Sequence, residues 1–169
     1  MTTPVWKDAP RVGPDRPFPS YAFLPNRGMP HPIRDQDGHS HGVEEEVVSL
    51  PPERWREDEA YLRGIDLYHA GYLWEAHEAW EGIWKASTDD AQRAYLRALI
   101  QIAAALIQAR LDNPRGVAKL LERAAEGLDR VKTARCMGVD TATLAGAVER
   151  TRTASSEAPR LAPYDPKQG

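Results

Sequence analysis

Hydrophobic positions repeat with helical spacing through the middle of the chain. Between residues 52 and 153, apolar side chains recur three and four positions apart, which is the period of an amphipathic α-helix. No segment there alternates apolar and polar residues over the length of a strand. The pattern predicts an all-α fold, a small multihelical bundle of about five antiparallel helices joined by short turns.

Residues that cap or break helices divide this region into segments. The first helix is expected from Pro51 and Pro52 to about Ala70, because proline is tolerated in a first turn and Gly71 ends the pattern. The other helices are expected from Tyr72 to about Ala86, from Ala91 to Leu111, from Pro114 to Val131 and, as a short last helix, after Asp140. Residues 91–111 are apolar around most of the helix, so this helix should be the central one.

The two ends of the chain lack the helical period. Nine of the 14 prolines come before Pro52, and three more lie after residue 158. Residues 1–50 are therefore expected to form an extended Pro/Gly-rich arm packed on the bundle. Residues 51–153 are expected to form the helical bundle domain, and residues 154–169 a flexible tail.

Composition and charge narrow the expected partners. The 169 residues fit one domain, and a formal net charge of -3 provides no long-range attraction to nucleic acid or to an anionic membrane. Neither is expected as a partner. The first residues carry charges and prolines in place of an apolar signal segment, so a cytoplasmic location is expected. The single cysteine, Cys136, excludes an intramolecular disulfide.

Candidate chemistry is concentrated on the second predicted helix. His77 and Glu81 are one helical turn apart, so their side chains can reach the same point. With Glu78 between them they read H-E-x-x-E, a relative of the zinc-protease motif H-E-x-x-H. In that motif the outer residues bind the metal and the intervening glutamate is the general base. The pattern predicts a divalent metal site, for zinc or a similar ion, with Glu78 as the catalytic residue.

A structural explanation of the same residues stays open. A histidine at the edge of an apolar face can hydrogen-bond a neighbouring helix, while Glu75, Glu78 and Glu81 form a solvated face. In that case His77 binds no metal ion.

The arm carries three of the five histidines, all within residues 31–41. Prolines on both sides of His31 restrict its backbone, which lowers the entropy cost of docking that imidazole against a helix. We expect the arm to fold over the bundle and to present His31 or His39 to the edge formed by His77 and Glu81, completing a three-ligand metal site. The alternative is a solvated segment that bears histidines.

Two motifs occur together in this chain, Gly-Tyr-Leu-Trp-Glu-Ala-His-Glu-Ala-Trp-Glu-Gly-Ile-Trp at 71–84 and Leu-Ile-Gln-Ile-Ala-Ala-Ala at 99–105. They resemble the prokaryotic domain of unknown function 309 family, and the Pro-His-Pro and Gly-His-Ser segments resemble an N-terminal extension of some members. The resemblance implies a small all-helical fold and the family's label of a metal-dependent hydrolase. The motif residues that it implies are Glu75, His77, Glu78, Glu81, Trp84 and Gln101.

Two classes of function follow from these patterns. The first is a metal-dependent hydrolase acting on an unknown small molecule or peptide. The second is a tetratricopeptide-like interaction or homo-oligomerisation module with a purely structural His/Glu/Gln network, since Tyr68, Gly71 and Ala76 match the turn of such a hairpin. About 41 residues separate Gly71 from Asp112, however, and the tetratricopeptide repeat is about 34 residues long.

Overall fold

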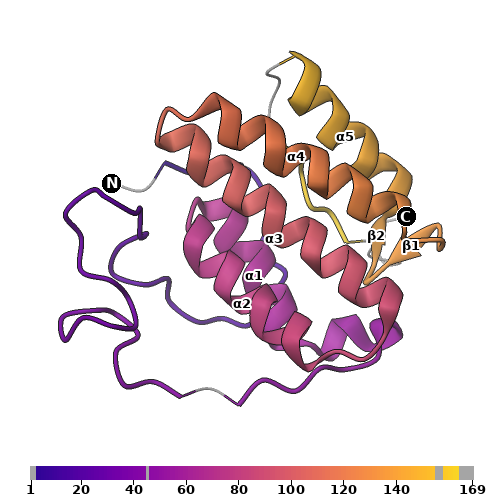
Figure 1. Ribbon diagram of the computed structural model, residues 1–169. Coiled ribbons are helices and arrows are strands. Elements are labelled where there is room, and N and C mark those ends of the chain that lie inside the picture. Colours follow the sequence, from indigo (N-terminus) through magenta and orange to yellow (C-terminus); the bar gives the residue numbers. More distant parts are fainter. Residues whose placement is uncertain (1–2, 45, 155–157, 164–169) are drawn as a thin grey trace.

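The structure, a computed structural model, describes residues 3–44, 46–154 and 158–163 (Figure 1). Its elements are the 3-10 helix η1 (Pro52–Glu57), the helices α1 (Glu59–Ala70), α2 (Leu73–Ala86), α3 (Asp90–Arg110), α4 (Pro114–Asp129) and α5 (Thr141–Ala154), and the strands β1 (Arg135–Cys136) and β2 (Val139–Asp140). The predicted all-α bundle is confirmed. Among the described residues, no helix has the length and apolar content needed to cross a membrane.

Each helix packs mainly against its neighbours in the chain, and α3 lies between α2 and α4 (Figure 1). Side chains of α3 that are fully buried include Tyr95, Leu96, Leu99 and Ile102. Burial of each such side chain stabilises the fold by about 1.5–3 kcal/mol. The central position predicted for this helix follows from its apolar circumference, which leaves few surfaces that favour water.

Helix ends form where short polar side chains cap them. Asp89 accepts a hydrogen bond from the backbone N–H of Gln92 at the start of α3, and Asn113 accepts one from Gly116 at the start of α4. Gly71 ends α1 in the left-handed conformation, with φ of 90°, which favours glycine. These caps keep α2, α3 and α4 close to their predicted bounds.

The first helix was predicted to run without interruption to Ala70, and this prediction is wrong. Asp58 leaves the helical conformation (φ -83°, ψ 88°) and divides the segment into η1 and α1. Its carboxylate accepts a hydrogen bond of 2.9 Å from the N–H of Tyr61, so it acts as an N-cap. An internal aspartate can therefore restart a helix without a proline or glycine.

A small hairpin precedes α5, where the sequence predicted only a break. Arg135 pairs with Asp140 and Cys136 with Val139, and the turn uses positive φ at Met137 (46°) and at the following glycine (82°). Strands of two residues are too short to show an alternating pattern, which is why the sequence did not predict them.

The arm follows the α1 and α2 side of the bundle (Figure 1). Backbone N–H groups of the arm reach both helices: Val12 donates to the Asp66 carboxylate (2.8 Å) and Phe23 donates to the Glu75 carboxylate (2.8 Å). These hydrogen bonds hold the arm in place, because an irregular segment makes few backbone hydrogen bonds within itself.

Part of the C-terminal tail also packs against the bundle, in contrast to the flexible tail predicted over residues 154–169. Leu161 is buried, its N–H donates to Nε2 of His69 (3.2 Å), and the hydroxyl of Tyr68 donates to the carbonyl of Pro159 (2.7 Å). Residues 155–157 and 164–169, which fall under the same prediction, lie outside the described residues.

Candidate metal centre

Helix α2 positions the candidate residues by its amphipathic pattern. Its buried side includes Leu73, Ala76, Trp80 and Ile83, which pack in the core with α1 and α3. The adjoining half-exposed surface carries His77, Glu78 and Glu81. The core contacts therefore set the rotation of α2 and leave these three side chains at the edge of the protein.

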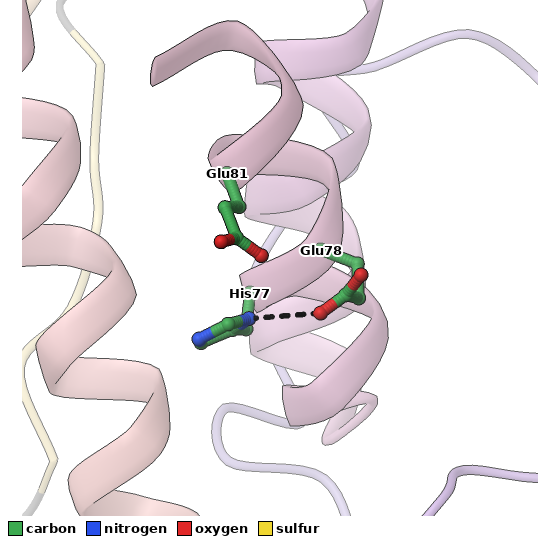
Figure 2. A group of neighbouring side chains, drawn as sticks. All are labelled: His77, Glu78 and Glu81. Carbon is green, nitrogen blue, oxygen red and sulfur yellow. Dashed lines mark ion pairs between the residues drawn. The ribbon is translucent and has the colours of Figure 1, made fainter. Parts of the chain in front are cut away.

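His77, Glu78 and Glu81 form one group (Figure 2). One nitrogen or carboxylate oxygen of each residue lies within 4.8 Å of the others, and the group is the one cluster of this kind found among the described residues. The Glu81 carboxylate points along the helix toward the His77 ring (Figure 2), as the four-residue spacing predicts. The side chains keep 26% (His77), 35% (Glu78) and 30% (Glu81) of their exposure, so the group is open to solvent.

The contact between His77 and Glu78 has an unusual geometry. Nδ1 of His77 lies 3.3 Å from Oε1 of Glu78, yet Nδ1 is buried and has no hydrogen-bond partner among the described residues. Two ligands that bind one zinc ion at tetrahedral angles are about 3.3–3.6 Å apart, given metal–ligand distances of 2.0–2.2 Å. The separation of these two atoms therefore equals that of two ligands sharing an ion.

Lys85 is a neighbour of the group that the sequence interpretation missed. Its Nζ lies 3.2 Å from Oε1 of Glu81, and its side chain is 64% exposed. The signal was present, because Glu81 and Lys85 have the four-residue spacing of a helical ion pair. Lys85 partly neutralises Glu81 and competes with any cation bound there.

Glu75 belongs to a separate, buried pair. Its Oε1 lies 3.0 Å from Nε2 of His39 and accepts a hydrogen bond from the N–H of Phe23 (2.8 Å), and the Glu75 and His39 side chains are 5% and 7% exposed. Nδ1 of His39 in turn contacts the hydroxyl of Ser40 at 2.8 Å. Burial raises the pKa of Glu75, and the hydrogen bonds from Phe23 and His39 oppose that rise. This pair attaches the arm to α2.

His31 packs against aromatic rings and lies apart from the metal-ligand group. Its ring stands edge-on to Trp74, with centroids 5.4 Å apart, and tilted to Phe23 at 5.2 Å. Its Nδ1 accepts hydrogen bonds from the backbone N–H groups of Ile33 and Arg34, both at 3.3 Å.

The arm thus folds over α2, but the structure brings neither of the two candidate histidines to His77 and Glu81. His39 is held by Glu75 and His31 by Trp74 and Phe23. The third member of the group is Glu78, which the helical wheel places a quarter-turn from His77. Its side chain curls back along the helix surface and joins the other two (Figure 2).

Gln101 and Trp84 complete the set of predicted residues. The Arg93 guanidinium lies over the Trp84 ring at 4.7 Å, which sets the register between α2 and the antiparallel α3. His77 lies seven residues before Trp84 in α2, and Ile100 lies seven residues after Arg93 in α3. In antiparallel helices these two positions are at the same height, so His77 is expected level with Ile100, which precedes Gln101. Oε1 of Gln101 is buried and has no hydrogen-bond partner among the described residues. The register of the two helices thus predicts an unused acceptor at the level of the site.

The donor set suits a divalent ion. One imidazole and two carboxylates are ligands that zinc accepts, and three protein ligands on one helix leave positions for water. The unpartnered Nδ1 of His77 is the atom that such an ion would satisfy.

One comparison with known proteins found a match, and the match lies within the helical core. Residues 61–120 match the model of a family described as "Domain of unknown function (DUF309)". Searches of curated proteins and of solved structures found no match. The matched segment runs from α1 into α4 and includes His77, Glu78, Glu81 and Gln101. Over this segment, 60 of its 169 residues, the chain is similar to the domain of unknown function 309 family.

Proposed function

We propose that this protein binds a divalent metal ion, zinc or a similar ion, on α2 through His77, Glu78 and Glu81. The supporting observation is the 3.3 Å separation of His77 Nδ1 and Glu78 Oε1 without a hydrogen bond, in a group whose ligand atoms lie within 4.8 Å. Two carboxylates on adjacent turns of a helix repel each other, and a bound cation removes that repulsion. With Nδ1 on the ion, Nε2 of His77 carries the proton, and Gln101 is a candidate acceptor for it.

The proposed activity at this site is hydrolysis of a small molecule or peptide. A bound zinc ion supplies a water molecule whose pKa is lowered to about 7. The chain's own contribution is a site on an exposed helix face, where a substrate can approach. Glu78 is the most exposed of the three side chains, so it is the residue best placed to leave the group and to accept a proton.

A purely structural network of the same residues is less well supported. Networks that fix the register of a bundle have their buried polar atoms satisfied, because each unpaired atom costs about 1–3 kcal/mol. Here the buried atoms His77 Nδ1, Glu75 Oε2 and Gln101 Oε1 lack partners among the described residues. The unpaired atoms favour a site that is completed by a ligand.

Metal titration of the full-length protein tests the proposal. After dialysis against a chelator, calorimetric titration with zinc should show one equivalent bound to the wild type. Glu81→Gln and His77→Ala should bind at least about tenfold more weakly, because even residues that only orient a ligand change metal affinity by about 10–100-fold. His41→Ala, which removes an exposed arm histidine, is the matched control and should bind as the wild type does.

The titration and an activity assay have separate outcomes. Zinc binding that is unchanged in His77→Ala would overturn the proposed site. Stoichiometric zinc at this site, with no metal-dependent turnover of ester, phosphoester or amide substrates, would keep the site and overturn the hydrolase.

A further inference from the structure

A cavity lies between the N-terminal arm and the end of α1. It has a volume of about 170 Å³ and is lined by Pro4, Trp6, Lys7, Ala9, Pro10, Arg11, Phe18, Asp66, His69 and Ala70. None of these residues belongs to the metal centre on α2. The cavity exists because the N–H groups of Val5 and Trp6 donate to the carbonyl of His69 (2.9 and 3.0 Å), while Val12 is held by Asp66.

The hydrogen bonds of His69 determine which ring nitrogen carries its proton. The backbone N–H of Leu161 donates to Nε2 at 3.2 Å, so Nε2 is an acceptor and carries no hydrogen. Burial, together with the nearby Arg160, lowers the pKa of His69 to about 4, so the ring is neutral at physiological pH. The proton is therefore on Nδ1, which makes Nδ1 a donor.

This donor and a second one beside the same cavity lack acceptors. Nδ1 of His69 and Nε1 of Trp6 are both buried, and neither has a hydrogen-bond partner among the described residues. The indole nitrogen can only donate. Buried N–H groups are nearly always paired, with protein, ordered water or a ligand. Both residues line the same cavity, so their unpaired donors favour an acceptor that binds there.

The charges around the cavity favour an anion over water as that acceptor. Lys7 and Arg11 line it, and the Arg160 guanidinium lies 5.5 Å from the centre of the Trp6 ring. The one acidic lining residue, Asp66, is fully buried and already accepts hydrogen bonds from Val12, Gly13 and Arg11. Its charge is thus engaged by the arm and by Arg11, and the remaining polar side chains of the lining are the cation Lys7 and the N–H donors Trp6 and His69.

We propose that this cavity binds a small oxyanion, a carboxylate or a phosphate, through the indole N–H of Trp6 and Nδ1–H of His69, with the exposed Lys7 also lining the cavity. The volume suits such a molecule, since it equals the share of about six water molecules in the liquid. The site is independent of the proposed metal centre, because the two share no residue. A ligand in this cavity would fasten residues 4–13 of the arm to α1.

Titration of the full-length protein with sodium acetate and with sodium phosphate, each compared with sodium chloride at equal ionic strength, tests this site. Either oxyanion should move the indole ¹H–¹⁵N resonance of Trp6 in a saturable way, and the two arms show whether a carboxylate or a phosphate binds. Trp6→Phe keeps an aromatic ring and removes the donor, so affinity should fall about tenfold, the effect of losing a hydrogen bond to a charged group. Because this variant has no Trp6 indole resonance, its binding is followed by the backbone amide resonances of Lys7 and Ala70, which line the cavity. Trp55→Phe, a partly buried tryptophan elsewhere, should bind as the wild type does.

A measurement without ligand keeps the test decisive. Because the Trp6 N–H is unpaired, Trp6→Phe loses no hydrogen bond in chloride alone, so any loss of stability there comes from the smaller ring. If neither acetate nor phosphate moves the Trp6 resonance beyond the effect of chloride, or if Trp6→Phe binds them as tightly as the wild type does, the proposal is overturned. Loss of zinc binding on α2 would leave it untouched.

Discussion

Helix α2 contributes the glutamates of two histidine–glutamate arrangements that differ in their surroundings. In one, Glu75 and His39 are 3.0 Å apart and 5% and 7% exposed, and each has a further partner, the N–H of Phe23 and the hydroxyl of Ser40. In the other, His77 and Glu78 are 3.3 Å apart and 26% and 35% exposed, without a hydrogen bond. The two histidine–glutamate distances are thus similar, but the first contact is buried and mostly hydrogen-bonded, whereas the second is partly exposed and has no hydrogen bond.

This difference separates the roles of the two arrangements. The buried pair joins segments 36 positions apart in the chain, so it determines where the arm lies. The open group lies within one turn of one helix and holds nothing in place. Removal of one partner from a buried pair leaves a buried polar group unpaired, whereas a solvated group adapts at little cost. The first should matter for stability and the second for binding.

The largest expected effect is that of breaking the buried pair from the arm side. His39→Ala leaves the buried Glu75 carboxyl without its imidazole partner, so the free energy of unfolding should fall by about 3 kcal/mol, the upper end of the cost of an unpaired buried polar group. The arm should also become sensitive to limited proteolysis. Denaturant unfolding measures the first effect, and His41→Ala, an exposed histidine two positions away, should change stability by less than about 0.5 kcal/mol. Equal losses in both variants would remove the distinction between the two arrangements.

Zinc should stabilise the protein through the open group only. At a free zinc concentration 100 times the dissociation constant, the free energy of unfolding should rise by about 2.7 kcal/mol. Glu81→Gln should show no such rise, while His39→Ala should retain it, because its lesion lies in the other pair. Thermal unfolding with and without zinc makes the comparison. Stabilisation that persists in Glu81→Gln would place the ion elsewhere.

The buried Glu75 should also make the stability of the protein depend on pH, an effect that a side chain without a titrating group would not have. Burial raises the pKa of Glu75 above its ordinary value of 4.5, so the folded state keeps a proton that the unfolded state loses. The resulting stabilisation is complete below pH 4.5 and is lost as the pH rises through the folded pKa.

Glu75→Gln isolates this contribution. Its amide keeps an acceptor for the N–H of Phe23 and does not titrate, so the wild type should lose stability relative to the variant as the pH rises from 4 to 8. Unfolding by denaturant at a series of pH values measures the difference, in which other titrating groups cancel. Parallel profiles would show that Glu75 is not desolvated in solution.

Most of the fold could be predicted because its determinants are local. The apolar period and the caps at Gly71, Asp89 and Asn113 act within a few residues, so α2, α3 and α4 lie near their predicted bounds. Asp58 was missed, because a capping aspartate within a periodic segment resembles any exposed polar residue.

The site could be predicted only where helix geometry fixes it. Four-residue spacing brings Glu81 to His77 whatever else the chain does. The participation of Glu78 depends on its side-chain rotamer, and the pairing of His39 with Glu75 depends on the path of an arm that has no period. Neither property is determined by spacing, so the predicted third ligand was an arm histidine, whereas the structure supplies a carboxylate.

The smallest expected effect concerns Lys85, which forms a surface ion pair with Glu81 of the open group. The pair with Glu81 is exposed, so Lys85→Ala should lower the free energy of unfolding by only about 0.3–0.5 kcal/mol. The same interaction must be given up when Glu81 binds a cation, so zinc affinity should rise by about twofold, which is that energy expressed as a binding constant. Calorimetric titration of Lys85→Ala beside Lys132→Ala, an exposed lysine outside the group, measures the change. Weaker zinc binding in Lys85→Ala would contradict a competition between Lys85 and the cation for Glu81, and the open group would then lose the feature that distinguishes it from a solvated helix surface.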